Sequence, residues 1–199
     1  MKKTEMKVKI TMLEDILGTL PGDPEVYKSY IASKAPETKS INDEIELIGE
    51  EGVYEKGMTV FIRNKQGNPC LFDYLIKGFF KNAASALRGA DDTKTKKLAA
   101  HKKKIDNLVF ISPRLIEIHD FDEIAICERP LRASTAQGER VALSCSESIP
   151  AGSTIEFTVT CLSKDMMDYV IEWLDYGEFN GLGQWHNSGK GRFTWEQID

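Results

Sequence analysis

Alternating apolar and polar residues predict strands near both ends of the chain. Residues 6–12 and 154–162 alternate at every second position, which is typical of a strand with one buried face. Shorter apolar runs predict further strands at 58–62, 70–72, 108–111, 115–118, 124–127, 140–144 and 193–195. The turn-forming residues between 63 and 69 favour a hairpin of the strands at 58–62 and 70–72.

Apolar residues at helical spacing predict two helices, at 73–87 and 164–176. The first helix is predicted to bury Tyr74, Leu75, Phe79, Ala83, Ala86 and Leu87. The second is predicted to bury Met167, Val170, Ile171 and Leu174. Residues 20–57 are expected to form a helical insertion. Residues 90–106 are expected to form a basic insertion that is flexible or partly helical, because they are rich in lysine and poor in apolar residues.

Without these insertions the order is strand, helix, strand, strand, helix, strand. That order is typical of an α+β, ferredoxin-like (RRM-like) unit, in which two helices lie on one antiparallel sheet. We therefore expect residues 1–199 to form a single domain enlarged by insertions.

Composition and charge narrow the class of protein. The chain has 199 residues, 26 Lys and Arg against 31 Asp and Glu, and a net charge of −5. No apolar stretch has the length of a membrane helix, and the basic start is not followed by an apolar signal segment, so we expect a cytoplasmic protein without membrane contact. The acidity argues against a general nucleic-acid binder. Cations nevertheless concentrate locally, at 77–104, 129–140 and 190–192.

The four cysteines do not predict a metal site, because no two of them have the close spacing of zinc ligands. We expect buried structural thiols in a reducing compartment, with no metal and no cofactor. The cysteines are Cys70, Cys127, Cys145 and Cys161.

The most distinctive segment is a glycine-rich loop at 181–193. It contains Gly181, Gly183, Trp185, His186, Gly189, Lys190, Gly191 and Arg192. Glycines allow close backbone approach and anion-binding turns, the two cations attract phosphate, and the aromatic rings offer stacking surfaces. The alternative is a tight structural turn between a helix and an edge strand.

This loop, together with residues 75–84 and 147–153, resembles the glycine-rich signature of the RAMP superfamily. These are the Cas7-like, Cas5-like and Cas6-like RNA-binding proteins of CRISPR systems. The resemblance implies a subunit that binds single-stranded RNA, with DNA as the alternative, and that assembles with copies of itself or with related subunits. A stand-alone relative from a phage or mobile element is a further reading. The resemblance also implies that the loop and the first helix, with Lys77, Lys81 and Arg88, hold phosphates.

Other cations leave two readings open. Residues 129–135 are predicted to form a second basic loop. Arg129 and Arg132 in this loop are expected either to bind phosphate or to form salt bridges with neighbouring glutamates. The same two alternatives apply to Arg114.

Catalysis has weak support in the sequence. His119, which precedes Asp120, and His186 are the candidate general bases, and His101 lies among lysines. A non-catalytic RNA-binding protein is therefore favoured. One alternative is a metal-independent endoribonuclease of the Cas6 type. Another is a protein-binding inhibitor or mimic of a CRISPR complex, which would suit the acidic balance.

Overall fold

The computed structural model describes residues 3–22, 58–135 and 138–199, and for 130–135 and 138–143 it describes the backbone alone. The predicted helical insertion at 20–57 therefore lies almost entirely outside the described residues. The described chain divides into two compact units. One comprises residues 3–16, 62–123 and 149–199, and the other comprises 17–22, 58–61, 124–135 and 138–148.

The first unit is built on a seven-stranded sheet of described residues, in the order β12-β1-β11-β8-β6-β5, with β7 also paired to β11. Its centre is the antiparallel pair β1 and β11, in register from Thr4 opposite Cys161 to Thr11 opposite Thr154. Strand β12 pairs antiparallel with the other edge of β1. The bounds are β1 (Thr4–Met12), β5 (Ile62–Arg63), β6 (Pro69–Phe72), β7 (Val109–Ser112), β8 (Leu115–His119), β11 (Thr154–Cys161) and β12 (Phe193–Ile198).

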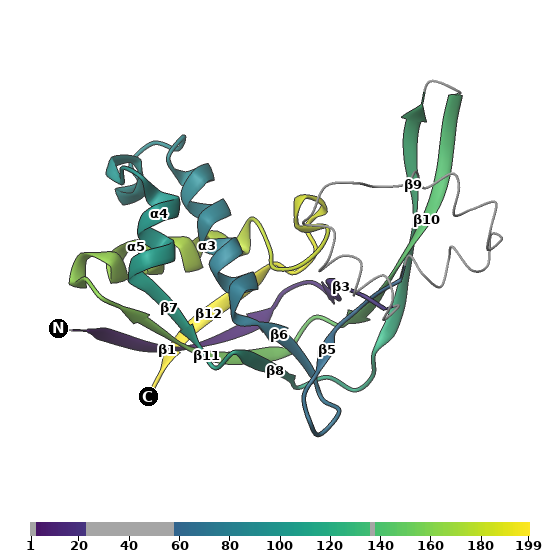
Figure 1. The fold of residues 1–199 in the computed structure, drawn as a ribbon, viewed down its shortest axis with the longest axis horizontal. Coiled ribbons are helices and arrows are strands. Elements are labelled where there is room, and N and C mark those ends of the chain that lie inside the picture. The colour runs from purple at the N-terminus through teal and green to yellow at the C-terminus, as the bar shows by residue number, and fades with distance from the viewer. Residues whose placement is uncertain (1–2, 23–57, 136–137) are drawn as a thin grey trace. The chain divides into compact units, whose positions relative to one another are not determined.

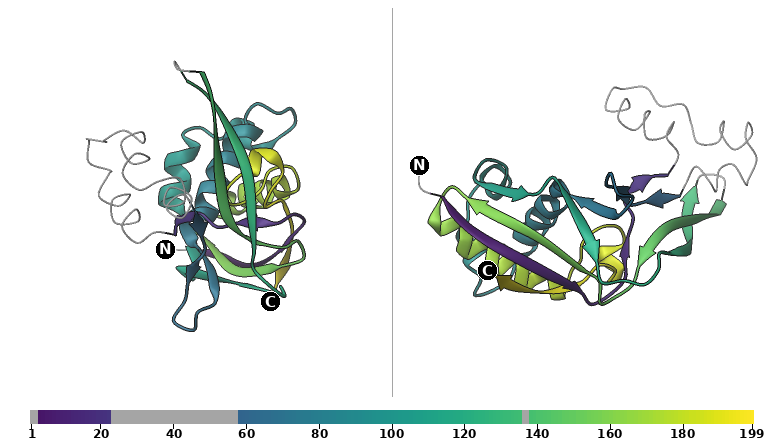
Figure 2. Two further views of the ribbon diagram at one scale, coloured as in Figure 1. Left: turned by 90° about the vertical axis from the view of Figure 1, so that its right-hand side faces the viewer. Right: turned by 90° about the horizontal axis from the view of Figure 1, so that it is seen from below.

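Helices cover one face of this sheet (Figure 1). Seen from below, β1 lies in front of them (Figure 2). They are α3 (Asp73–Leu87), α4 (His101–Leu108) and α5 (Lys164–Asp175). The first helix has the predicted bounds, and the second ends one residue earlier than predicted and continues as the 3₁₀ helix η2 (Tyr176–Glu178).

The core lies between the helices and the alternate residues of β1, namely Met6, Val8, Ile10 and Met12. Its helical side consists of Ile76, Phe79, Phe80, Ala83, Ala84, Met166, Met167, Val170, Trp173 and Leu174.

Three residues predicted to be buried are exposed instead. These are Tyr74, Ala86 and Ile171. The physical reason is the packing of α3 against α5. The faces of the two helices that meet carry Phe80 and Trp173, whose ring centroids lie 5.6 Å apart. Helical spacing alone did not include either ring in the predicted core.

The basic segment 90–106 contains the 3₁₀ helix η1 (Lys94–Lys97) and the first turns of α4. Glu172 of α5 anchors it, because its carboxylate accepts hydrogen bonds from the backbone N–H of Lys94 at 2.7 Å and of Thr95 at 2.9 Å. The Thr95 hydroxyl also donates to Glu172, and Trp173 Nε1 donates to the Thr95 oxygen at 3.0 Å. The structure shows helices in this segment, and the expectation that it is flexible stays a prediction.

Among its described residues, the second unit carries a five-stranded sheet in the order β2-β10-β4-β3, with β9 paired to β10. Strands β9 and β10 form a long antiparallel hairpin that includes the predicted strands at 124–127 and 140–144. The predicted basic loop at 129–135 is wrong, because these residues continue strand β9. The bounds are β2 (Ile16–Leu17), β3 (Leu20–Pro21), β4 (Thr59–Val60), β9 (Ala125–Thr135) and β10 (Gly138–Ile149).

Three of the four cysteines are buried, and Cys127 is half-buried, so the expectation of burial fails for that thiol. All four are free. Burial raises the pKa of Cys161 to about 11, and burial followed by the Glu117 carboxylate raises the pKa of Cys70. In the described part of the chain, no helix is long and apolar enough to cross a membrane.

Candidate nucleic-acid interface

The two ends of the glycine-rich loop cross each other at glycines. A Cβ atom on Gly181 would lie 2.2 Å from the carbonyl oxygen of Lys190, and one on Gly191 would lie 2.1 Å from the carbonyl oxygen of Leu182. The N–H of Leu182 donates to the Gly191 oxygen at 2.9 Å. Gly191 also has a φ of +67°, a conformation that disfavours any side chain. These two glycines are therefore required by the fold of the loop itself.

The interior of the loop is a series of tight turns. Gly183 and Gly189 have φ values of +79° and +88°, and Trp185 adopts a positive φ of +59° without being glycine. The 3₁₀ helix η3 (His186–Ser188) follows Trp185, and His186 Nδ1 lies 3.1 Å from the Gly183 oxygen. The half-buried His186 is thus held by the backbone of its own loop.

Both cations of the loop are paired with carboxylates that follow β1. Lys190 Nζ lies 2.6 Å from Asp15, and an Arg192 guanidinium nitrogen lies 3.0 Å from Glu14. Arg192 also donates to the Glu178 carbonyl oxygen at 3.4 Å. The charge of the loop is therefore locally balanced.

The helices α3 and α4, which contact each other, carry more positive than negative charge. We call this the α3–α4 surface, and define it by six cations and two carboxylates of the two helices and the C-cap of α3. Its members are Lys77, Lys81, Arg88, Lys102, Lys103, Lys104, Asp73 and Asp106. The structure thus places Lys77 and Lys81 on α3 and Arg88 at its C-cap, and α4 adds three lysines.

Asp106 is the carboxylate nearest the α3 lysines. Lys81 Nζ lies 2.6 Å from it, and Lys77 Nζ lies 3.5 Å from the Asp106 carbonyl oxygen. Lys77 also lies over the Phe110 ring, with its Nζ 4.8 Å from the centroid. One carboxylate side chain cannot neutralise both lysines, so the surface keeps its positive character.

His101 fastens the start of α4 to the end of α3. Arg88 has only donors, so it donates to His101 Nδ1 at 3.3 Å, and Nε2 then carries the proton toward Ser85 Oγ at 3.0 Å. Ser85 in turn donates to the Lys81 oxygen at 2.8 Å. Burial, followed by the charges of Arg88 and Lys102, lowers the pKa of His101, which favours this neutral form.

A cluster of rings and one guanidinium lies at the start of α3. The rings of Phe72 and Tyr74 stack with centroids 5.1 Å apart and an interplanar angle of 19°. The Arg114 guanidinium carbon lies 5.3 Å from the Phe72 centroid and 5.6 Å from that of Tyr74. Sequence reasoning placed Tyr74 in the core and left Arg114 open, and it did not single out Phe72. Phe72 is in β6, Tyr74 is in α3, and Arg114 is in the turn before β8. Because Arg114 is distant in sequence from the two rings, only the aromatic pair Phe72-x-Tyr74 could have been recognised from the sequence.

The central strands offer no comparable rings on the face that the helices leave open. The described residues of that face on β1 and β11 are Glu5, Lys7, Lys9, Thr11, Thr154, Glu156, Thr158 and Thr160. RRM-type domains stack bases on aromatic residues at the centre of the sheet. Among the described residues the exposed rings are Tyr74 on α3, Phe110 on β7, which pairs with Thr160 of that face, and Phe179 after η2.

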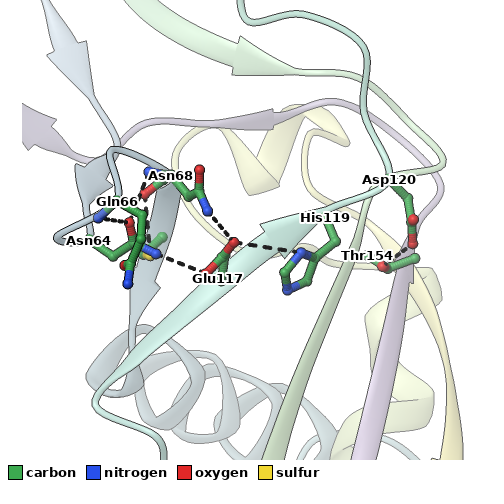
Figure 3. Close-up of polar contacts among 8 residues, drawn as sticks. Asn64, Gln66, Asn68, Glu117, His119, Asp120 and Thr154 are labelled. Atoms are coloured by element: carbon green, nitrogen blue, oxygen red, sulfur yellow. Dashed lines mark hydrogen bonds and ion pairs between the residues drawn. The ribbon is translucent and has the colours of Figure 1, made fainter.

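His119 and Asp120, which are adjacent in the sequence, have different partners (Figure 3). Asp120 has a φ of +59° and accepts a hydrogen bond from the Thr154 hydroxyl at 2.5 Å. The carboxylate beside the exposed His119 is instead Glu117, whose Oε1 lies 3.8 Å from Nδ1. Glu117 is already engaged, because Asn64 and Asn68 donate to it at 2.8 Å and 2.5 Å. This arrangement does not hold His119 in the way a general base is usually oriented.

Arg129 and Arg132 are both positions of strand β9. The register pairs Arg129 with Ser144 and Arg132 with Val141. Positions three residues apart in a strand belong to opposite faces, so these two positions do not share a face. The side chain of Arg132 lies outside the described part of the structure.

No group of metal-ligating side chains occurs among the residues that the structure describes. The prediction that Gly181, Gly183, Trp185, Gly189, Lys190 and Arg192 contact nucleic acid remains a prediction, as does the same role for Arg129 and Arg132.

No protein-family model matches the chain, and no curated protein matches its sequence. A chain from the cryo-EM structure of the Type III-B Cmr-beta bound to cognate target RNA matches it in structure, with a TM-score of 0.51 and 12% sequence identity. The two chains therefore have a similar fold. The match covers 100% of this chain and 60% of the other, so this chain spans less than two thirds of the neighbour's length. This match agrees in fold with the expected resemblance, and the resemblance of the glycine-rich loop itself stays a prediction.

Proposed function

We propose that the protein binds single-stranded RNA on its α3–α4 surface, as a non-catalytic subunit of a CRISPR-like or phage-encoded ribonucleoprotein. The observation that carries this proposal is the concentration of six cations against two carboxylates on two contacting helices of a chain whose net charge is −5. Phosphate contacts by Lys and Arg dominate the affinity of proteins for nucleic acids.

The topology of the first unit supports the proposal. Strands β12, β1, β11 and β7 are neighbours in that order and pair antiparallel, with α3 following β6 and α5 joining β11 to β12 along the chain. We infer a ferredoxin-like core, in which β5, β6 and β8 are additions. That core is shared by many RNA-binding modules, but it is not evidence of RNA binding by itself.

Gly78 supports the same surface. It lies in the interior of α3 between Lys77 and Lys81, where glycine costs about 0.5–1 kcal/mol relative to alanine. A Cβ atom there would meet nothing within 4 Å, so the packing of the protein does not require a glycine. A bound strand that lies close to the helix backbone would require one.

The assembly part of the proposal has a different basis. The structural neighbour was solved as part of Cmr-beta bound to cognate target RNA. We infer that this chain also works beside other subunits, as copies of itself or as related proteins. The glycine-rich loop would add phosphate contacts in such an assembly if Lys190 and Arg192 left Asp15 and Glu14 for RNA.

The experiment is a titration of a labelled single-stranded RNA with the protein, followed by fluorescence anisotropy between about 50 and 200 mM salt. The test variant replaces Lys102, Lys103 and Lys104 with Glu. Each lost phosphate contact on a single strand lowers the slope of log affinity against log salt by about 0.7. We therefore expect the triple variant to bind weakly and its salt slope to fall by about two.

A matched control replaces Lys3, Lys7 and Lys65 with Glu. These lysines are exposed in the same unit, so the change in total charge is identical. The control is expected to retain most of the affinity. Equal losses in the two variants would assign the effect to net charge, and an absence of binding by the unmodified protein at low salt would refute the proposal.

A further inference from the structure

The cluster at the start of α3 has an unusual geometry. Its three groups are almost equidistant, since the two ring centroids are 5.1 Å apart and the Arg114 guanidinium carbon is 5.3 Å from one and 5.6 Å from the other. A guanidinium stacked on the outer face of Tyr74 would lie about twice as far from Phe72 as from Tyr74. Arg114 therefore lies beside the stacked pair and does not cover its outer end.

The cluster is held in place while its surface stays accessible. Arg114 donates to Asp73 at 2.6 Å through its side chain, and its carbonyl oxygen accepts the N–H of Asp73 at 3.0 Å. The Arg114 side chain nevertheless keeps 67% of its surface exposed, and Tyr74 keeps 44%. Groups fixed before binding lose little conformational entropy when a ligand arrives.

The charge beside the rings indicates the ligand. Tyr74 and Lys77 are three residues apart on α3 and so lie on the same side of the helix within one turn. Lys77 also lies against the Phe110 ring. An accessible aromatic pair with a planar guanidinium at its side and an ammonium one turn away matches the two parts of a nucleotide. Unpaired bases stack on such rings and on Arg, and cations hold the phosphate.

We propose that Phe72, Tyr74 and Arg114 form a stacking site for one unpaired base of the bound RNA, and that Lys77 holds an adjoining phosphate. This inference rests on the proposed function and specifies it, because a stacking site requires unpaired bases. It places base contacts at the edge of the sheet, whereas the lysines of α4 contact the backbone alone.

The test uses a single-stranded uridine RNA that contains one 2-aminopurine, whose fluorescence falls when the base stacks on an aromatic ring. The unmodified protein is expected to quench it. Tyr74→Leu removes the ring and keeps an apolar side chain, and we expect it to weaken binding about 5- to 150-fold, the usual effect of losing one base–aromatic stack. Quenching should be lost and the salt slope should be unchanged, because no charge is removed.

Two controls accompany this variant. Tyr74→Phe keeps the ring and should bind and quench like the unmodified protein. Phe179→Leu removes another ring of the same unit, one that is 75% exposed, and should have no effect. Thermal melting of each variant checks folding, which an exposed tyrosine is not expected to control.

The outcomes separate the two proposals. If the unmodified protein binds RNA but Tyr74→Leu binds and quenches equally well, the stacking site is refuted and the α3–α4 surface stands. If Tyr74→Leu weakens binding to duplex RNA of the same sequence as strongly as it weakens binding to the single strand, stacking of an unpaired base is refuted. If it lowers only the self-association of the protein, the rings belong to a protein contact. If no RNA binds at low salt, both proposals fail.

Discussion

The glycine-rich loop and the α3–α4 surface are both basic in sequence, but they differ in what surrounds their cations. In the loop, Lys190 and Arg192 each have a carboxylate partner, at 2.6 Å and 3.0 Å. On the α3–α4 surface there are six cations and two carboxylates, and one of these carboxylates, Asp73, pairs with Arg114 outside the set. A run of cations in sequence therefore indicates an anion site only after the acidic groups that the fold brings to it have been counted.

Their glycines differ in the same way. Gly181 and Gly191 are needed where the loop crosses itself, whereas Gly78 lies in a helix beside open space. A glycine that the internal packing explains says nothing about a ligand. A glycine that the internal packing does not explain indicates a ligand that approaches the backbone there.

The largest effect that we expect comes from breaking the crossing of the loop. Gly191→Ala would place a Cβ atom against the Leu182 backbone at a φ of +67°. The strain of the conformation and the overpacking together are expected to lower the free energy of unfolding by about 2–5 kcal/mol, measured by urea denaturation.

Gly189→Ala is the matched control for the crossing. It has a φ of +88°, but its Cβ would have no neighbour closer than 3.8 Å. Only the conformational cost of about 1–2 kcal/mol should appear. Equal destabilisation by the two substitutions would show that the crossing is not the reason for the glycine at 191.

The next largest effect concerns RNA affinity and compares the two regions directly. Lys77→Ala with Lys81→Ala should weaken RNA binding more than Lys190→Ala with Arg192→Ala. The reason is that both loop cations must give up a carboxylate, Asp15 or Glu14, before they can hold phosphate. On α3 this applies to Lys81, which pairs with Asp106, whereas Lys77 contacts only the Asp106 carbonyl oxygen and the Phe110 ring. Both double variants lose two positive charges, so anisotropy titrations at one salt concentration compare them fairly. A larger loss for the loop variant would make the loop the main site.

The sequence predicted the local elements well and their partners poorly. Helical spacing and the stop at Gly89 predicted the bounds 73–87 of α3, and strict alternation predicted the strands β1 and β11. These signals are readable because they depend only on residues that are close in sequence. The side of each helix that faces the core was mispredicted at Tyr74 and Ile171, because Phe80 and Trp173 select it by packing on each other.

The candidate site was harder to predict, because its chemistry depends on distant contacts. Asp15 lies 175 residues from Lys190, and Glu172 anchors Thr95 from 77 residues away. Arg114 reaches Asp73 across 41 residues. No local pattern encodes such pairings. The lysines of 94–104 were visible as a basic run, but not as part of a surface shared with α3.

A smaller effect tests the junction of the α3–α4 surface. His101 has a lowered pKa in the folded protein and its ordinary value of 6.5 when unfolded. Between these values the unfolded chain binds more protons, so the free energy of unfolding should fall as the pH drops below about 6.5. Denaturation midpoints at pH about 7.5 and about 5.5 measure the change.

His101→Gln is the control for that pH dependence. It cannot titrate, so its midpoint should depend less on pH than that of the unmodified protein. The charged groups facing His101 are Arg88 and Lys102, which stay protonated throughout this range. An identical pH dependence in the two proteins would mean that other groups control acid sensitivity.

The smallest change is the most informative about why the two regions differ. Gly78→Ala adds one methyl group to α3 where nothing lies within 4 Å, so it should raise the free energy of unfolding by about 0.5–1 kcal/mol. If RNA lies close to the helix there, the same methyl group should weaken binding in the anisotropy titration. Stability and affinity would then change in opposite directions, which a residue with a purely structural role does not produce. A variant that is more stable and binds equally well would show that no strand approaches α3 at Gly78. The positive charge of the α3–α4 surface would then have to attract RNA at a greater distance from the helix.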